Sequence, residues 1–432
     1  MRRLLVQTQL SNYDASGKFI LEADSGWQMT MGRVRQMLKL VPDLHVDVMG
    51  PLNTQVITEP LVLNKDLFEE HGDRLRYVPH NIIPNALATR FDFDFKGLSK
   101  ALYLKQHQQD EDAKYYGVYI NDPMHLRNFK ALFNVEAKYQ PKFFVHSHFI
   151  DNPECPKFPT DASLWLGQCE AALRSDYNFW QCESAMNVFF ESFAKTYNEQ
   201  SLNIVKSKSN PWDDGYSSEE MNTKVETKNL RFTPSQFKKL TDNKIVIFVP
   251  NRIGGQGRSS DYTNCGKFMF EILPQLRKLR QDYVVIAGNP NQKFTNKELV
   301  QQCGQNGYVS LVPDALTRDE FKFVVKNSHI SVGLYDQDSY GGTVARECIE
   351  LGCLPLWIDN YEYSSIAKDA GFDMLGKPDF SDIVETTDRL IDSVKSLGSY
   401  KNKIVNKLQK VVRSRCSYEE TTPVALKKMG LL

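Results

Sequence analysis

Apolar and polar positions divide the first half of the chain into short strands and longer helices. Short apolar runs bounded by turn residues are typical of strands buried in a parallel sheet, whereas apolar residues three and four apart predict a helix. Because the two patterns alternate, the first half is predicted to form a parallel sheet with helices on both faces. The predicted strands are residues 4–9, 44–50, 115–120, 141–146 and 177–182, and the predicted helices are 29–40 and 162–174.

A second alternating series follows a polar segment. Residues 199–242 are rich in Ser, Asn, Lys and acidic residues, and we interpret them as a connection between two domains. The chain is therefore predicted to be α/β, with two doubly wound halves of similar size, and ligands of such folds bind at the carboxyl ends of the strands. The later strands are predicted at 244–250, 282–288, 308–312, 329–334 and 354–358, and the helices at 267–278, 318–326, 343–351 and 382–396.

Composition narrows the class of protein. The chain has 432 residues, of which 41% are hydrophobic and 11% aromatic, and this composition excludes disorder over most of the chain. The 53 basic residues equal the 53 acidic residues, so a uniformly basic nucleic-acid surface is excluded while a local basic groove is not. No apolar run approaches the roughly 20 residues that span a bilayer, and no membrane partner is expected. The eight cysteines form no Cys-x-x-Cys pair, which predicts reduced thiols in a cytoplasmic protein.

Residues 336–356 carry the richest candidate chemistry. They follow a predicted strand and open a predicted helix, and Gly341 and Gly342 allow a ligand to approach the backbone. The backbone N–H groups from Gly342 to Ala345 would lie at the positive end of the helix, so the segment predicts a diphosphate site. Glu347 lies one turn further on, where its carboxylate could hold the two hydroxyls of a ribose. The plainer alternative is a strand-to-helix crossover with a Gly-Gly turn and no ligand.

This segment resembles the nucleotide-sugar motif of GT-B glycosyltransferases, especially the retaining ones. Glu347 matches the second acid of the family's motif, and Gly352 and Pro355 match the start of its next strand with one residue inserted. The first acid is replaced by Ser339, and Asp338 lies one position earlier. The resemblance implies a GT-B fold, in which two Rossmann-like domains face one another across a cleft and the second binds the nucleotide-sugar.

A second loop carries the same resemblance. The family uses an arginine and a lysine after the first strand of the donor domain to hold the diphosphate, and Arg252 and Lys267 match them. Fixed cations would stabilise the negative charge that develops on the leaving diphosphate. Taken singly, each could instead be a solvated loop residue. The donor-binding residues implied are Asn251, Arg252, Arg258, Lys267, Tyr340, Gly341, Gly342, Thr343, Val344 and Glu347.

Two histidines, His146 and His148, end a predicted strand of the first half. The stretch resembles the His-x-His segment of phage α-glucosyltransferases that act on hydroxymethylcytosine in DNA, and in the family a histidine at this strand end touches the donor sugar. The alternative is a pair of polar strand-end residues without a direct role. The catalytic residues implied are His146, His148, Asp338 and Ser339, and those expected at the acceptor are Arg33 and Asp151.

No metal site is predicted. The histidine pair has no third ligand nearby in the sequence. The Asp-x-Asp stretches at Asp92 and Asp336 lie among residues more typical of an edge strand or a loop. We therefore expect no obligatory cofactor, with a divalent metal at most stimulating the reaction.

The resemblance also sets the expected domain bounds. An acceptor domain would span residues 1–240, with the connection at 199–242, and a donor domain would span 241–415. A C-terminal helix at 416–432 would cross back to the first domain. The protein is expected to be a monomer or a weak dimer.

The reaction implied by the resemblance is the transfer of a sugar with retention of configuration. The expected donor is a UDP-sugar, with UDP-arabinose and UDP-glucose as candidates, and the expected acceptor is the hydroxyl of hydroxymethylcytosine in double-stranded phage DNA in the host cytoplasm. The leaving phosphate would take the acceptor proton, so no protein base is predicted. Two alternatives stay open, namely a bacterial enzyme that builds a polysaccharide or glycolipid and a non-catalytic nucleotide-binding scaffold.

Overall fold

The chain forms two compact units. Unit 1 comprises Met1–Asp214 together with Tyr418–Leu432, and unit 2 comprises Gly215–Ser417. The computed structural model describes residues 2–8, 10, 21, 25–52, 61, 63–84, 91–102, 114–136, 139–148, 150, 162–250, 268–287, 308–312, 316–334, 342–359, 361–377, 379–396 and 398–432.

Unit 1 is built on a seven-stranded sheet of order β3-β2-β1-β6-β7-β8-β9. All of its pairings are parallel. Because the strands are parallel, their carboxyl ends meet along one edge of the sheet. The strands are β1 (Arg2–Gln7), β2 (Leu44–Pro51), β3 (Leu75–His80), β6 (Tyr115–Ile120), β7 (Lys142–Ser147), β8 (Tyr177–Trp180) and β9 (Ser209–Pro211). A separate antiparallel pair joins β4 (Ile82–Pro84) to β5 (Phe91–Phe93).

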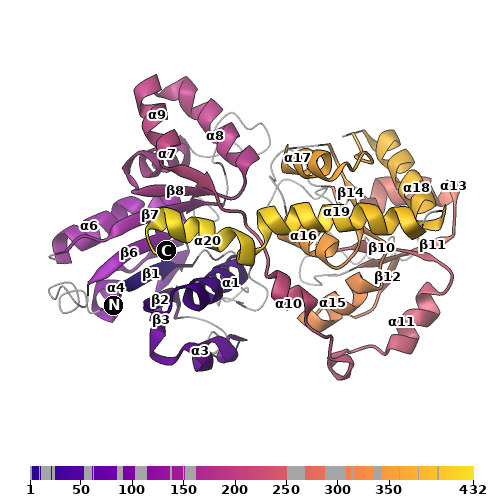
Figure 1. Ribbon diagram of the computed structural model, residues 1–432, viewed down its shortest axis with the longest axis horizontal. Helices are drawn as coiled ribbons and strands as arrows, with labels where there is room; N and C mark the ends of the chain where they lie inside the picture. The colour runs from indigo at the N-terminus through magenta and orange to yellow at the C-terminus, as the bar shows by residue number, and fades with distance from the viewer. Residues whose placement is uncertain are drawn as a thin grey trace. The chain divides into compact units, whose positions relative to one another are not determined.

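Helices follow most strands of unit 1, as the crossover connections of a parallel sheet require. The C-terminal helix α20 (Tyr418–Met429) packs against α1 (Ser25–Leu40), as Figure 1 shows. A side chain at Gly32 would collide with the Tyr418 ring, so this approach of the two helices requires a glycine. The remaining helices are α3 (Lys65–His71), η2 (Gly72–Arg74), α4 (Phe95–Ala101), η3 (Pro123–His125), α6 (Leu126–Glu136), α7 (Ala162–Arg174), α8 (Glu183–Thr196) and α9 (Glu199–Ser207).

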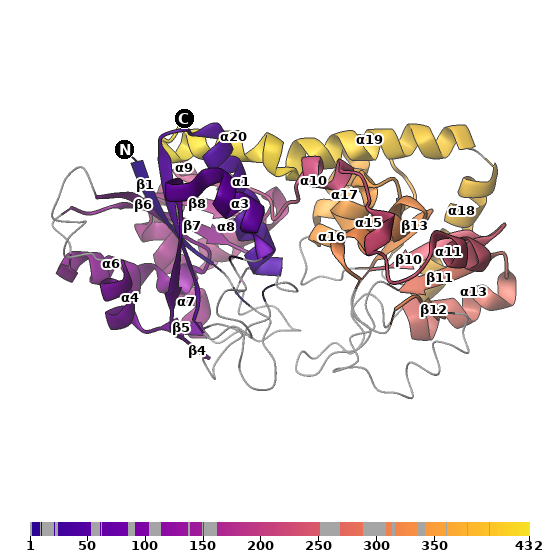
Figure 2. The same cartoon turned by 90° about the horizontal axis from the view of Figure 1, so that it is seen from below.

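Unit 2 is built on a five-stranded sheet of order β12-β11-β10-β13-β14, again entirely parallel. The strands are β10 (Ile245–Val249), β11 (Tyr283–Ala287), β12 (Tyr308–Ser310), β13 (Ile330–Gly333) and β14 (Leu354–Trp357). Its helices are α10 (Ser218–Asn222), η4 (Thr227–Asn229), α11 (Pro234–Thr241), η5 (Phe268–Ile272), α13 (Leu273–Leu279), α15 (Arg318–Lys326), α16 (Thr343–Glu350), α17 (Tyr361–Ala370), α18 (Phe380–Ser396) and α19 (Gly398–Cys416). The long helix α19 runs alongside α16, α17 and α18 (Figure 2).

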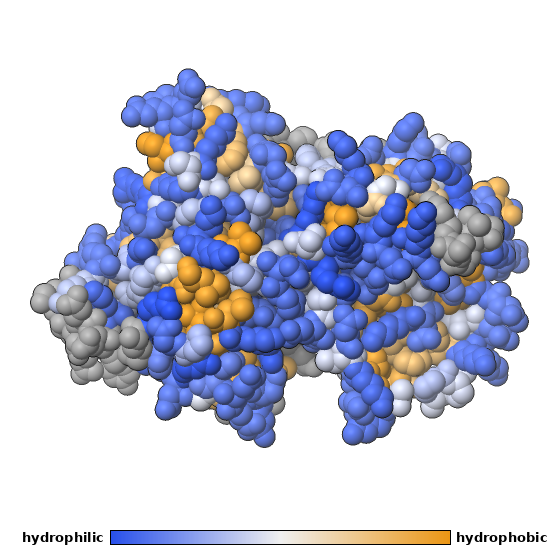
Figure 3. Space-filling model, viewed as in Figure 1, coloured by the Kyte–Doolittle hydropathy of each residue, from blue (hydrophilic) through white to orange (hydrophobic). Residues whose placement is uncertain are grey.

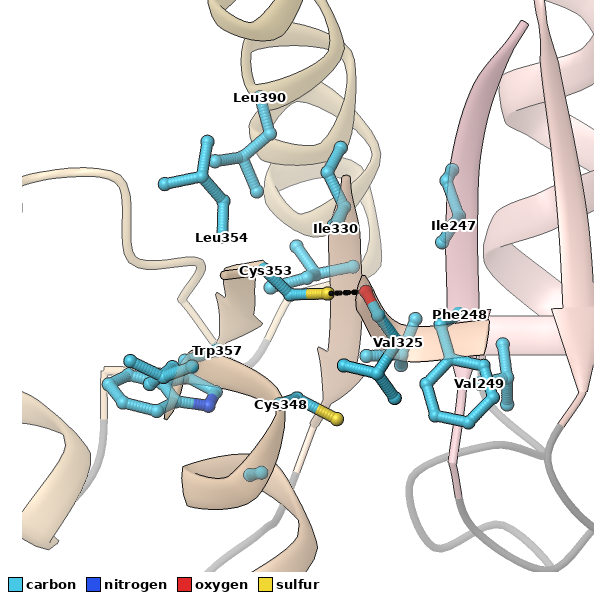
Figure 4. Close-up of a cluster of buried hydrophobic side chains, with 14 of the residues drawn as sticks. Ile247, Phe248, Val249, Val325, Ile330, Cys348, Cys353, Leu354, Trp357 and Leu390 are labelled. Atoms are coloured by element: carbon cyan, nitrogen blue, oxygen red, sulfur yellow. Dashed lines mark hydrogen bonds between the residues drawn. The ribbon is translucent and has the colours of Figure 1, made fainter. Parts of the chain in front are cut away.

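The core of unit 2 holds helix α16 against the sheet. Figure 4 shows Cys348 of α16 among side chains from β10, β13, β14 and α15. Cys353 adds a hydrogen bond, from its Sγ to the backbone oxygen of Val325 at 3.4 Å. Gly352, which joins α16 to β14, has φ of +103°, a conformation that favours glycine. Helix α16 is therefore placed by a packed core and by the tight turn after its carboxyl end.

The predicted α/β class is confirmed, and each predicted strand is present with small shifts at its ends. The division between the units differs from the expected boundary near residue 240, since it falls between Asp214 and Gly215. The segment 199–242 is not a plain connection: α9 and β9 complete unit 1, and α10, η4 and α11 belong to unit 2. Side-chain caps at Asn198, Ser217 and Thr233 start the three α-helices in this polar stretch, which explains why a pattern of apolar residues missed them.

Among the residues that the structure describes, no helix combines the length and the apolar character needed to cross a bilayer. On the face in Figure 3, hydrophilic residues predominate, and an apolar area lies near the end of α20.

Candidate functional site

The predicted site residues fall into two groups. Outside the described residues lie Asp151, Asn251, Arg252, Arg258, Lys267, Asp338, Ser339, Tyr340 and Gly341. The structure places Arg33, His146 and His148 in unit 1, and Gly342, Thr343, Val344 and Glu347 at the start of α16 in unit 2.

Polar side chains of unit 1 gather where parallel strands end. Asn121 follows β6, His148 follows β7, and Asp214 comes shortly after β9. They meet because parallel strands end along the same edge of the sheet. Together with residues of α1, β6 and β7, they form a set in which each residue is at most 7% exposed. This set, termed the histidine cluster, comprises Arg33, Tyr119, Asn121, His146, His148 and Asp214.

Asp214 is the centre of the histidine cluster. Its Oδ1 accepts a hydrogen bond from Nη2 of Arg33 at 3.0 Å, and both of its oxygens lie within 2.8 Å of Nδ1 of His148. Burial acts to raise the pKa of Asp214, but His148 and Arg33 outweigh burial and hold it below its ordinary value. Asp214 is therefore an ionised carboxylate that organises two cations.

Hydrogen bonding sets the charge of His148. Nδ2 of Asn121 donates to the backbone oxygen of Gln7, so Oδ1 of Asn121 faces Nε2 of His148, at 2.9 Å. The other ring nitrogen faces the carboxylate of Asp214. Because both neighbours can only accept, both ring nitrogens of His148 must carry protons. His148 is therefore an imidazolium, buried with its counter-ion.

His146 has the opposite protonation. The hydroxyl of Tyr119 accepts from Nη1 of Arg33 at 3.0 Å, so it donates its own proton to Nδ1 of His146, 2.6 Å away. The remaining proton lies on Nε2, which is 3.3 Å from Oδ1 of Asp214 but makes no hydrogen bond within the described part of the chain. Burial, with Arg33 and His148, lowers the pKa of His146 well below its usual value. A neutral ring thus stacks on a charged one, with centroids 4.3 Å apart.

The spacing of His146, His148 and Asp214 would admit a metal ion, since one ligand atom from each lies within 4.8 Å of the others. The chemistry of the donor set fits a metal poorly. Both ring nitrogens of His148 already donate hydrogen bonds, and the Arg33 guanidinium touches the same carboxylate that an ion would need. The hydrogen bonds of the histidine cluster therefore use the atoms that a metal ion would need as ligands.

Acidification should destabilise unit 1. Burial lowers the pKa of His80 from 6.5 to about 4, and the pKa of His146 is also lowered. Between pH 6.5 and pH 4, these histidines therefore bind protons in the unfolded chain but not in the folded one. The free energy of unfolding falls as the pH drops through this range. Each such group contributes a slope of up to about 1.4 kcal/mol per pH unit. Denaturant titrations between pH 7 and pH 4.5 would measure this slope.

The His80→Gln variant tests the attribution to individual histidines. In this variant the unfolding free energy should fall less steeply with decreasing pH, because one of the groups that binds a proton on unfolding has been removed. Tryptophan fluorescence suits the measurement because four of the five tryptophans belong to unit 1. Parallel curves for the variant and the parent chain would contradict the assignment to His80.

In unit 2, helix α16 begins at the carboxyl end of β13 without a side-chain cap. Two of the four amides expected to face a diphosphate already have partners. The N–H of Gly342 donates to the hydroxyl of Tyr363 at 2.7 Å, and the N–H of Ala345 bonds to the oxygen of Gly342 at 3.2 Å. The other two predicted amides are those of Thr343 and Val344, in the first turn of α16.

Glu347 lies one turn into α16, with its side chain 7% exposed. Its Oε1 accepts from Nη2 of Arg318, the first residue of α15, at 2.6 Å. The same arginine donates from Nε to Oε1 of Glu220 at 2.7 Å. Glu347 is therefore an ionised, oriented carboxylate near the start of the helix.

Glu350, three residues later, has a different environment. Its side chain is fully buried and accepts hydrogen bonds from four side chains. These are Tyr216, Ser218, Asn222 and Arg413, at 2.7–3.2 Å. Glu350 thus ties α16 to the first residues of unit 2 and to α19.

Several residues of these sites were not predicted from the sequence. Asn121 had a usable signal, since it ends a predicted strand. Asp214 had none, because β9 is only three residues long and lacks an apolar pattern. Arg33 was expected at the acceptor, but its side chain is completely buried within the histidine cluster.

The two parallel α/β units define the class of fold, which is the GT-B fold of glycosyltransferases. HepE from Anabaena, solved with UDP, matches with a TM-score of 0.63 and 12% identity over 100% of both chains. A glycosyltransferase from Rickettsia africae matches with a TM-score of 0.66 and 14% identity, over 99% of this chain and 97% of that one. Sucrose-phosphate synthase from Thermosynechococcus elongatus matches with a TM-score of 0.64 and 12% identity, over 99% of this chain and 98% of that one. No protein-family model and no curated protein matches the sequence.

Proposed function

We propose that this protein is a retaining glycosyltransferase that uses a nucleoside diphosphate sugar. The observation that carries the proposal is the oriented Glu347 carboxylate beside the uncapped start of α16, within a chain that has the GT-B fold over its full length. A UDP-sugar is the first candidate donor, because HepE was solved with UDP and with UDP-glucose.

Each part of the donor has proposed partners. Glu347 holds the ribose hydroxyls, and the amides of Thr343 and Val344 hold the diphosphate together with Arg252, Arg258 and Lys267. Asp338 and Ser339 contact the sugar. The complete burial of His146 changes its proposed role from direct contact to support, so that the histidine cluster orders the carboxyl edge of the first sheet.

For the acceptor we propose the hydroxyl of hydroxymethylcytosine in DNA. The support is the His146-x-His148 stretch and the Gly352-x-x-Pro355 spacing, both similar to phage enzymes. Burial of Arg33 removes one expected acceptor contact, which leaves Asp151 as the candidate from that pair. A polysaccharide or glycolipid acceptor is the alternative within the same reaction class.

Substitution of Glu347 by alanine should weaken binding of the nucleotide. Loss of hydrogen bonds to a carboxylate that is only 7% exposed costs about 1–3 kcal/mol, or roughly a fivefold to 150-fold rise in Kd. Calorimetric titration with UDP, GDP and ADP would measure the change. Glu385→Ala, at an exposed position of α18, is the matched control and should leave Kd unchanged.

Sugar transfer tests the reaction itself. Release of UDP from UDP-glucose and UDP-arabinose would be followed with hydroxymethylcytosine DNA, with unmodified DNA and without DNA. Release that requires the modified DNA supports the proposed acceptor, whereas donor binding without any response to DNA favours the polysaccharide or glycolipid alternative. If no nucleotide binds, the chain is not a glycosyltransferase of this kind.

A further inference from the structure

Arg318 lies between two carboxylates that come from different helices. It is the first residue of α15, whose start is held by Thr317 and Glu320 in a reciprocal capping box. From this position its guanidinium reaches Glu220 of α10 and Glu347 of α16. The cap places the backbone of Arg318, and the two acids then determine where its side chain points.

The orientation of the Arg318 guanidinium is set by four contacts. Nε donates to Glu220 at 2.7 Å, and Nη2 donates to Glu347 at 2.6 Å and to Sδ of Met221 at 3.7 Å. The Phe321 ring lies 5.5 Å from the guanidinium carbon. Arg318 nevertheless keeps 42% of its side chain exposed, whereas Glu347 keeps 7%. The arginine is thus held rigidly while one side of it remains open to solvent.

The pair leaves hydrogen-bonding capacity unused among the described residues. Within the described part of the chain, neither Oε2 of Glu347 nor Nη1 of Arg318 has a partner. One paired side chain therefore keeps an acceptor atom, and the other keeps a donor nitrogen of its planar guanidinium. A vicinal diol suits such a pair, because each hydroxyl both donates and accepts.

We propose that Arg318 is a positioning and specificity residue for the ribose of the donor. It orients the Glu347 carboxylate towards the two hydroxyls and donates from its own guanidinium to the 2′-hydroxyl. The proposal rests on the function proposed above, in which Glu347 holds the ribose. It adds discrimination against 2′-deoxynucleotides, since a deoxyribose would leave the charged donor unpaired in the site.

Paired titrations with UDP and 2′-deoxy-UDP test the proposal. The parent protein should bind UDP about tenfold more tightly, the effect expected for one hydrogen bond to a charged group. In Arg318→Ala this preference should shrink to about twofold or less, with weaker binding of UDP itself. Arg318→Lys keeps the charge but loses the planar guanidinium. Compared with Arg318→Ala, it should therefore recover part of the affinity for UDP and little of the preference for UDP over 2′-deoxy-UDP.

Arg231→Ala is the matched control. Arg231 is also a partly exposed arginine, and it pairs with the buried Glu320 of the same helix α15. Its loss should lower stability without changing the preference between UDP and 2′-deoxy-UDP. A readout that changes in Arg318→Ala and not in Arg231→Ala separates ribose recognition from general support of the helix.

Three results would overturn the proposal. The first is an unchanged preference for UDP over 2′-deoxy-UDP in Arg318→Ala. The second is tighter binding of UDP by that variant, which would mean that Arg318 blocks Glu347. The third is an equal change of the preference in Arg231→Ala. Failure of the proposed function has a different signature. In that case the parent protein binds none of UDP, GDP and ADP, or Glu347→Ala binds UDP as tightly as the parent.

Discussion

Replacement of Arg33 by methionine should lower the free energy of unfolding by about 3–5 kcal/mol, because it removes one of the two cations that pair with the buried Asp214 carboxylate and leaves several buried acceptors without their donor. Arg33 donates to Tyr119, to Asp214 and to the backbone oxygen of Asp213, at 2.8–3.0 Å. Its guanidinium also lies over the Trp212 ring, 4.7 Å from the ring centroid. Methionine fills much of the volume but offers no donor. Denaturant unfolding followed by tryptophan fluorescence would measure the loss in unit 1.

Arg35→Met, two positions along the same helix, is the control. Arg35 pairs with Asp66 at the surface, where the two side chains are 37% and 65% exposed. Such pairs contribute about 0–1 kcal/mol. The double variant Arg33→Met/Asp214→Asn should cost less than the sum of its single variants, because it removes both charges. Equal losses for Arg33→Met and Arg35→Met would refute a buried ionic centre in unit 1.

Replacement of Glu350 by glutamine should lower the stability of unit 2 by about 2–4 kcal/mol. The carboxylate only accepts hydrogen bonds, and its two oxygens receive them from four side chains. A glutamine amide would point its N–H₂ group at one set of donors, so several partners would lose their acceptor together. Scanning calorimetry of the whole chain would show the transition of unit 2 at a lower temperature.

Two further variants calibrate the Glu350 result. Glu226→Gln removes an exposed charge that lies 4.0 Å from Lys228 and should change stability by less than about 0.5 kcal/mol. Tyr216→Phe removes one donor to Glu350 and should cost about 1 kcal/mol. If Glu350→Gln costs no more than Tyr216→Phe, the acid does not act as the shared acceptor of the network.

The strand and helix pattern could be predicted because parallel sheets bury both faces. Runs such as residues 245–249 are apolar throughout, and this repeats in both units. The polar stretch 199–242 could not be interpreted in the same way. Its helices depend on caps at Asn198, Ser217 and Thr233, and its edge strand β9 has only polar residues and a proline.

The candidate site was predictable only where it is local in sequence. Gly342 and Glu347 lie within a few residues of each other, so the prediction of a nucleotide site could be made from this stretch of sequence and its resemblance to the glycosyltransferase motif. The histidine cluster draws on α1, β6, β7 and the end of unit 1, and the pairing of Arg318 with Glu347 joins residues from two helices. Such contacts depend on which strands are neighbours, and strand order is not encoded in local spacing.

The sequence by itself determined the α/β class, the two series of strands and the start of α16, because each depends on residues close together in the chain. Only the tertiary structure decided what the charged residues do. Glu347 and Glu350 lie three residues apart on one helix. Glu347 pairs with the partly exposed Arg318, whereas Glu350 is fully buried in a hydrogen-bonded network. Likewise, Arg33 belongs to the interior because Asp214, at the end of the first segment of unit 1, lies beside His148 and supplies the counter-ion of Arg33. The environment of a charge is set by distant parts of the chain, and it is this environment that separates a binding residue from a structural one.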